Sequence, residues 1–79
     1  MHMNDKRRVV IRKGLALLSE ARELLEQARD EEQEAFENIP EGLKESERGQ
    51  RMEEAADALD NAVSSMEDIE SELEQAMES

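Results

Sequence analysis

Residues 38–46 read Asn38-Ile39-Pro40-Glu41-Gly42-Leu43-Lys44-Glu45-Ser46, and they separate two long amphipathic segments. Pro40 removes a helical hydrogen bond and disfavours helical backbone at the residue before it, so a first helix is expected to end near Asn38. Gly42 permits the left-handed backbone that a chain reversal often requires. Ser46 is a favourable N-cap for a second helix. The stretch therefore predicts a turn between two helices.

Both segments carry apolar residues at the first and fourth positions of successive heptads, a pattern typical of coiled-coil helices. We expect a helix over 4–38, a loop over 39–46 and a helix over 47–77, all within one domain of residues 1–79. Because the loop is short and the helices are long, the helices must be antiparallel neighbours. The predicted fold class is all-α: an antiparallel two-helix hairpin with a coiled-coil-like, Ala-rich seam.

The predicted seam follows from heptad registers that begin at Ile11 and at Met52. Folding the chain about the turn sets small side chains against large ones, such as Gly14 against Leu73, which keeps the layers equal in volume. The seam residues are Ile11, Gly14, Leu18, Ala21, Leu25, Ala28, Ala35, Met52, Leu59, Ala62, Met66, Ile69 and Leu73.

A second apolar stripe is predicted to lie outside this seam. A lone hairpin has little apolar burial to offset the entropy lost on ordering the chain. We therefore expect a homodimer that forms a four-helix bundle, with the alternative that the stripe docks a different host or phage protein. The predicted dimer face consists of Val10, Leu15, Leu17, Leu24 and Val63.

The composition argues against catalysis. The 79 residues include 22 Asp and Glu against 10 Lys and Arg, which gives a formal net charge of −12. There is no Cys, one Phe and no Tyr or Trp, and the single histidine is His2. Neither a nucleophile paired with a base nor a set of metal ligands can be assembled from these residues. We expect no enzyme activity, no catalytic residue, no metal and no cofactor.

The apolar runs are too short for a membrane protein. The longest span residues 9–11 and 15–18, against the ~20 residues that a transmembrane helix needs, and charged residues separate them. The negative net charge also disfavours contact with anionic lipid. A cytoplasmic location without membrane contact is expected.

Two charged clusters are candidate partner-binding sites. The acidic run most simply forms a solvated face, since it matches neither a di-iron Glu-x-x-His motif nor an EF-hand. Glu32 is different, because it falls on the seam, where a carboxylate needs a partner such as Arg48 or Arg51. The candidate residues are Asp30, Glu31, Glu32, Glu34, Lys6, Arg7 and Arg8.

Two nucleic-acid hypotheses stand beside protein interaction. The basic cluster could contact RNA, as in a Rop-like bundle, but no aromatic residues interleave with it, so nucleic-acid binding is not favoured. Pairing with the acidic end of the second helix explains the cluster more simply. The acidic charge could instead imitate DNA. A dimer carrying twice −12 over ~45 Å has one charge per ~1.9 Å, against one per ~1.7 Å in duplex DNA.

The turn region carries a resemblance. Residues 30–43 read DEEQEAFENIPEGL, and Ser46-Glu47-Arg48-Gly49 follows. This arrangement, ahead of an Ala-rich acidic helix, resembles a group of small acidic helical proteins of bacteriophages and prophages. The resemblance covers roughly the last two-thirds of the chain. It implies a phage-related origin and a place in the host cytoplasm, and it carries no functional site over to this chain.

These observations predict a non-enzymatic, acidic oligomerisation or protein-interaction module. The alternative is a modulator of a nucleic-acid process, acting either as a DNA mimic that binds a basic DNA-binding protein or as an RNA-binding bundle.

Overall fold

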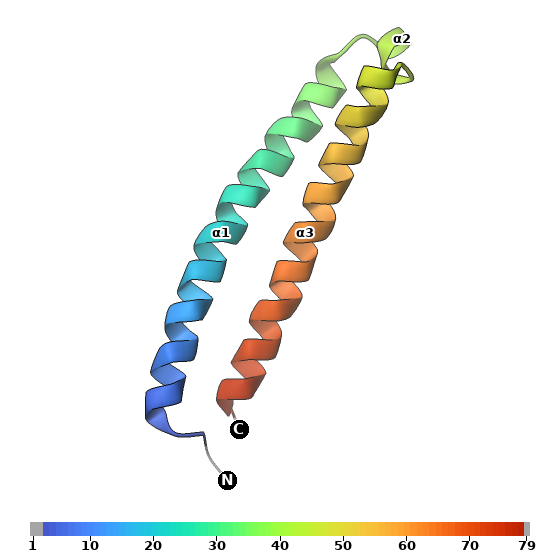
Figure 1. The fold of residues 1–79 in the computed structure, drawn as a ribbon. Coiled ribbons are helices and arrows are strands. Elements are labelled where there is room, and N and C mark those ends of the chain that lie inside the picture. The colour runs from blue at the N-terminus through green and yellow to red at the C-terminus, as the bar shows by residue number, and fades with distance from the viewer. Residues whose placement is uncertain (1–2, 79) are drawn as a thin grey trace.

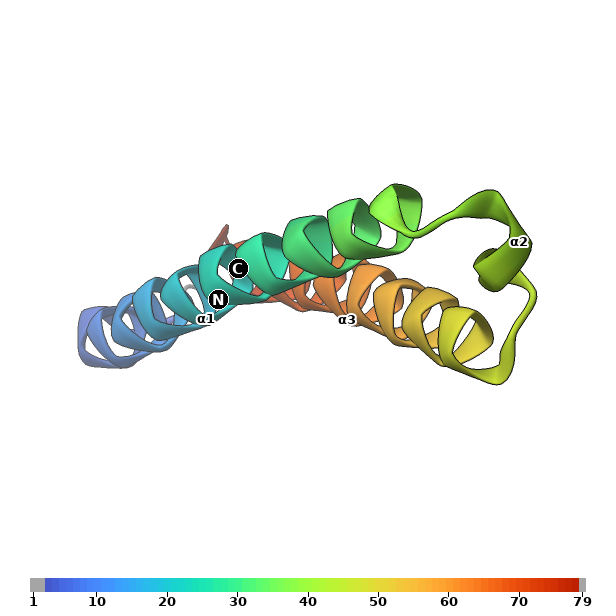
Figure 2. The same ribbon diagram turned by 90° about the horizontal axis from the view of Figure 1, so that it is seen from above.

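A computed structural model describes residues 3–78, and within them it contains three helices: α1 (Asp5–Asn38), α2 (Glu41–Lys44) and α3 (Glu47–Glu78). The two long helices lie side by side and run in opposite directions, with α2 at the tip between them (Figure 1). Seen from above, they lie at an angle to one another (Figure 2). The molecule measures 60 × 17 × 13 Å. It is a rod one helix pair thick.

The ends of α1 follow from local chemistry. Asn4 caps its start, where the side-chain Oδ1 accepts a hydrogen bond from the backbone N–H of Arg7 at 3.0 Å. At the other end, Ile39 has extended backbone (φ −75°, ψ 152°), as expected for a residue before proline. Pro40 therefore ends α1, and the chain turns into α2.

The loop expected over 39–46 contains the four-residue helix α2. Its residue Lys44 pairs with Glu41 at 2.9 Å, and its ammonium nitrogen lies 5.6 Å from the centre of the Phe36 ring, near the end of α1. Gly42 does not use a left-handed conformation, because no residue of the described chain has positive φ. The reversal is built from helical and extended backbone instead.

The entry into α3 depends on Ser46 and Gly49. The Ser46 hydroxyl donates to the Leu43 carbonyl and accepts from the backbone N–H of Gly49 at 3.2 Å, so Ser46 caps α3 as its sequence predicts. A Cβ on Gly49 would meet the Lys44 carbonyl oxygen and would lie 2.6 Å from that of Leu43. Glycine is therefore required where α3 passes under the tip.

Contacts between the long helices establish their register. Ser19 reaches Glu70 and Arg29 reaches Asp60, so ten residues forward along α1 correspond to ten residues back along α3. The positions that each helix turns toward the other alternate in spacing between three and four residues, as in a coiled coil. On α1 these half-buried residues are Ile11, Leu15, Leu18, Arg22, Leu25, Arg29, Glu32 and Phe36; on α3 the buried or half-buried residues are Gly49, Met52, Ala56, Leu59, Val63, Met66, Glu70, Leu73 and Met77.

The seam differs from the predicted one at every second position. Ala35, Ala62 and Ile69 were expected in it but are exposed, whereas Leu15 and Val63, expected on the dimer face, belong to it. Each helix is therefore rotated by about half a residue position, or roughly 50°, relative to the prediction: alternate seam residues stay in place and the others move on by one residue. On α1 this rotation replaces small residues with Leu15 and Phe36 at the seam, and larger apolar side chains gain more from leaving water.

The predicted close approach at Gly14 is also wrong, because a Cβ there would meet nothing within 4 Å. Of the remaining predicted seam residues, Ala21 and Ala28 are half-buried at the edge of the interface, beside Leu18 and Leu25. On α1, the contact with α3 is therefore centred on larger side chains such as Leu18 and Leu25, and not on the two alanines.

Candidate interaction surface

A stripe of large aliphatic residues remains in water on α1. Val10, Leu17 and Leu24 recur every seven residues and are 65%, 67% and 68% exposed. Within the described chain, by contrast, the buried apolar side chains are Ala56 and Val63, at 5% and 1% exposure. The hairpin thus leaves three large aliphatic side chains about two-thirds exposed along one line of α1. We call Val10, Leu17 and Leu24 the apolar stripe.

The apolar stripe lies on one side of the hairpin. Leu17 and Leu24 each precede a seam residue by one position, which places them about 100° round the helix from it. On α3, Ile69 likewise precedes the seam residue Glu70, and it is 43% exposed. When two helices are antiparallel, residues that precede a seam residue by one position lie on the same face of the pair, whichever helix they belong to. Ile69 and the apolar stripe therefore belong to the same side of the molecule.

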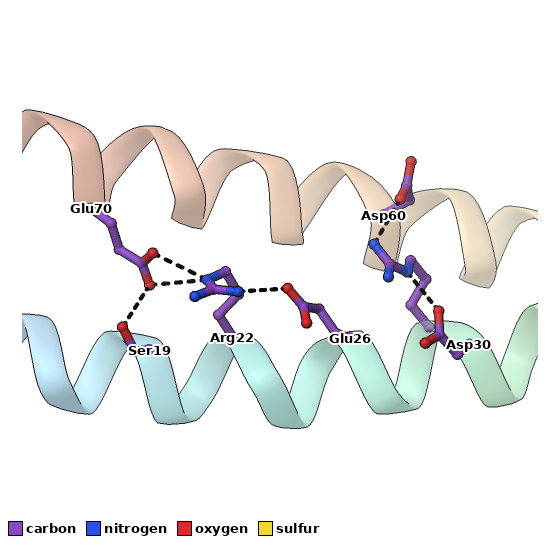
Figure 3. A network of polar contacts seen from close by, with 7 residues as sticks. Ser19, Arg22, Glu26, Asp30, Asp60 and Glu70 are labelled. Carbon is purple, nitrogen blue, oxygen red and sulfur yellow. Dashed lines mark hydrogen bonds and ion pairs between the residues drawn. The ribbon is translucent and has the colours of Figure 1, made fainter.

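The opposite side carries an ion-pair network (Figure 3). Arg22 donates from Nε to both carboxylate oxygens of Glu70 at 3.1 Å, and it also pairs with Glu26 at 2.6 Å. The Ser19 hydroxyl donates to Glu70 at 3.3 Å. Ser19 and Glu26 each follow a seam residue by one position, which places the network on the side away from the apolar stripe.

The network joins the helices at a half-buried site. The side chains of Arg22 and Glu70 are only 23% and 12% exposed. The hydrogen bonds that Arg22 donates to Glu26 and then to Glu70 raise the pKa of Arg22 above its ordinary value. A second bridge repeats the arrangement seven residues on, where Arg29 pairs with Asp30 at 3.1 Å and with Asp60 at 3.2 Å. Hydrogen bonding to Asp30 raises the pKa of Arg29 in the same way.

Arg22 and Arg29 were not singled out from the sequence. The available signal was their seven-residue spacing, in line with Leu15 and Phe36, which places two arginines on a seam opposite an acidic helix. Because each is paired across the helices, these residues fix the register and do not form an open site.

The predicted basic cluster is split. Lys6 and Arg7 are exposed on the first turns of α1. Arg8 is half-buried, donates from Nε to the Met77 carbonyl at 2.9 Å and pairs with Asp5 at 3.2 Å. Arg8 therefore places a positive charge at the C-terminal end of α3, where the helix dipole favours it.

The acidic run is mostly exposed. Asp30 pairs with Arg29, Glu31 accepts a hydrogen bond from Gln27 at 3.1 Å, and Glu34 is exposed. Glu32 is half-buried on the seam, but the expected ion pair with Arg48 or Arg51 is not found within residues 3–78. Arg51 pairs with Glu47 one turn away on α3, which satisfies it without reaching α1.

Neither a metal site nor a membrane-spanning helix is found in residues 3–78, the part of the chain that the structure describes, which excludes His2. There, no group of three acidic or histidine side chains is arranged to hold a metal ion. In the same residues, no helix is both long and apolar enough to cross a membrane. A shallow hollow at the tip is lined by Ile39, Pro40, Leu43, Ser46, Arg48 and Gly49.

The length of the rod lowers its charge density. Two copies side by side would carry twice −12 over 60 Å, or one charge per about 2.5 Å, against one per ~1.7 Å in duplex DNA. The predicted likeness to DNA is therefore weaker than the sequence suggests.

A scan of protein-family models finds no match to the chain, and neither does a search of curated proteins or of solved structures.

Proposed function

We propose that this chain is a non-enzymatic, acidic interaction module that functions as a homodimer, in which the apolar stripes of two hairpins pack together. The observation that carries the proposal is the exposure of Val10, Leu17 and Leu24, in line and seven residues apart, on a hairpin whose buried apolar side chains within residues 3–78 are Ala56 and Val63. Covering such a stripe gains roughly 25 cal/mol per Å² of apolar area, which a lone hairpin of this size needs. The resemblance of the turn to small phage proteins supports a phage-related origin and a host or phage protein as a further partner.

The test is the oligomeric state of a stripe variant. Sedimentation velocity at micromolar concentration is expected to give a dimer of the 9.0 kDa wild-type chain and a monomer of the Leu17→Glu/Leu24→Glu variant. The matched control is Leu43→Glu, because Leu43 is also an exposed leucine but lies at the tip in α2. A wild-type chain that is folded and monomeric at this concentration would overturn the proposal, as would a variant that remains dimeric.

A second candidate function, imitation of DNA, is supported by the charge of α3. From Met52 to Glu78 this helix carries acidic residues and no Lys or Arg. A mimic is expected to compete with duplex DNA for a purified basic DNA-binding protein and to lose that binding steeply as salt rises. Competition that is absent at low salt would exclude this function.

A further inference from the structure

The surface of α1 is polarised in charge along the apolar stripe. Lys6 and Lys13 lie three or four residues from Val10 and Leu17, so they border the stripe near the start of α1. Glu20 borders it between Leu17 and Leu24, and Glu31 continues its line. All four charged residues are exposed. The stripe is therefore edged by positive charge at one end and by negative charge at the other.

From this polarity we infer that the second hairpin binds antiparallel to the first, with α1 packed against α1 of the second copy and the two Leu17 side chains at the centre. The inference rests on the proposed dimer and specifies its arrangement. Val10 of one copy then lies beside Leu24 of the other, so the aliphatic residues cover one another along the whole stripe.

The antiparallel arrangement also matches the charges. With Leu17 at the centre, Lys13 comes beside Glu20 of the second copy, and Lys6 comes within a turn of its Glu31. In a parallel dimer, each lysine would face the same lysine of the second hairpin, and each glutamate would face the same glutamate. Like charges would then repel at every one of these positions. The parallel arrangement would also bring together the acidic runs over 30–37, which contain no basic residue.

The arrangement makes a geometric prediction. About 20 residues of α1 separate Leu17 from the tip, or roughly 30–35 Å at 1.5 Å per residue. The two tips are therefore expected roughly 70 Å apart, at opposite ends of the dimer. Residues level with Leu17 are expected within about 25 Å of their counterparts, since packed helices lie 8–10 Å apart.

Two single-cysteine variants measure these distances, because the chain has no cysteine of its own. Glu45→Cys places a spin label at the exposed tip, and Ala16→Cys places one at an exposed site next to Leu17. Double electron–electron resonance is expected to give a long distance for Glu45→Cys and a short distance for Ala16→Cys, with dimer formation checked by sedimentation of each labelled sample.

The other possible outcomes of the distance measurements distinguish a failure of the inference from a failure of the proposed function. A dimer with short distances at both sites would be parallel, which overturns the inference and leaves the proposed function standing. A dimer with a long distance at Ala16→Cys would use another face, which overturns the inference and the role of the apolar stripe. A monomer would overturn the proposed function and the inference with it.

Charge reversal provides an independent check. Lys13→Glu is expected to weaken the dimer about fivefold to tenfold, and Lys13→Glu/Glu20→Lys is expected to restore it, because both cross-pairs then have opposite charges again. Arg48→Glu is the matched control, since it makes the same charge change at the exposed tip. The antiparallel pairing would be contradicted if the double variant dimerised no more tightly than Lys13→Glu. It would also be contradicted if Arg48→Glu weakened the dimer as much as Lys13→Glu does.

Discussion

Gly49 lies so close to the backbone of the turn that there is no room for a Cβ atom. In Gly49→Ala, the new Cβ would press on the carbonyl groups of Leu43 and Lys44, which are backbone atoms and cannot rotate away. We expect the substitution to lower the free energy of unfolding by about 2–3 kcal/mol. Urea denaturation followed by circular dichroism measures the change.

Gly14 is the control for that experiment. It lies inside α1, and a Cβ there would meet nothing within 4 Å. Gly14→Ala is therefore expected to stabilise the chain by about 0.5–1 kcal/mol through the lower entropy of the unfolded state. If the two alanine variants were equally stable, the described path of α3 beneath the tip would be wrong.

The Arg22–Glu70 pair is expected to contribute more than ion pairs at the surface. Arg22→Gln leaves the half-buried Glu70 carboxylate without its positively charged partner from α1, so the melting temperature should fall by a few degrees. Arg51→Gln is the control, because Arg51 and Glu47 are both exposed and lie on the same helix. Equal effects of the two substitutions would show that the cross-helix bridge adds nothing.

The pH dependence of this pair has a defined sign. The pKa of Arg22 is raised in the folded chain, so the stabilisation is complete below the pKa of arginine in the unfolded chain and is lost only as pH rises through the higher folded value. The difference in unfolding free energy between wild type and Arg22→Gln is therefore expected to stay constant from about pH 7 to 10, where arginine is charged in both states. A difference that shrinks steadily over this range would contradict the assignment.

Two residues that act on their own backbone were predicted correctly from the sequence, although the left-handed conformation expected at Gly42 is not found. Residues that act across the helices could not be predicted. Pro40 ends α1 and Ser46 caps α3 because each affects groups within a few positions. The partner of Glu32 was predicted wrongly, and the partners of Arg22 were not predicted, because pairing across helices depends on rotations that a single sequence does not specify.

On the scale of the helices, the main difference from the prediction is the rotation of the seam. Heptad spacing identifies two long helices with an apolar face, but neighbouring positions compete for the centre of that face when alanine, leucine and valine are mixed. On α3 the choice lay between the line through Ala62 and Ile69 and the line through Ala56 and Val63, and the second line is buried. The expected dimer face was wrong for Val63 for the same reason.

Two neighbouring alanines test the rotation directly. Ala56 is 5% exposed, so Ala56→Leu forces three extra carbon atoms into the seam and is expected to destabilise the hairpin by about 1–3 kcal/mol. Ala55 is exposed one residue away, and Ala55→Leu is expected to change stability by less than about 0.5 kcal/mol. Chemical denaturation of both variants measures the contrast. If Ala55→Leu destabilised the hairpin more than Ala56→Leu, the seam predicted from the sequence would be correct and the described one wrong.

On the scale of the whole molecule, the hairpin is long, thin and poorly buried. A rod of 60 × 17 × 13 Å presents most of its surface to water, and its two buried apolar side chains within residues 3–78 are small. A structure of this kind gains stability from anything that binds the folded form and not the unfolded one. In our account a second copy of the chain does this, by covering the apolar stripe.

The most direct test is thermal unfolding followed by circular dichroism over a hundredfold range of protein concentration. If folding and dimerisation are coupled, the melting temperature is expected to rise with concentration in the wild type and to become constant in Leu17→Glu/Leu24→Glu. A wild-type melting temperature that does not change with concentration, together with a sedimenting species of 9.0 kDa, would contradict the account.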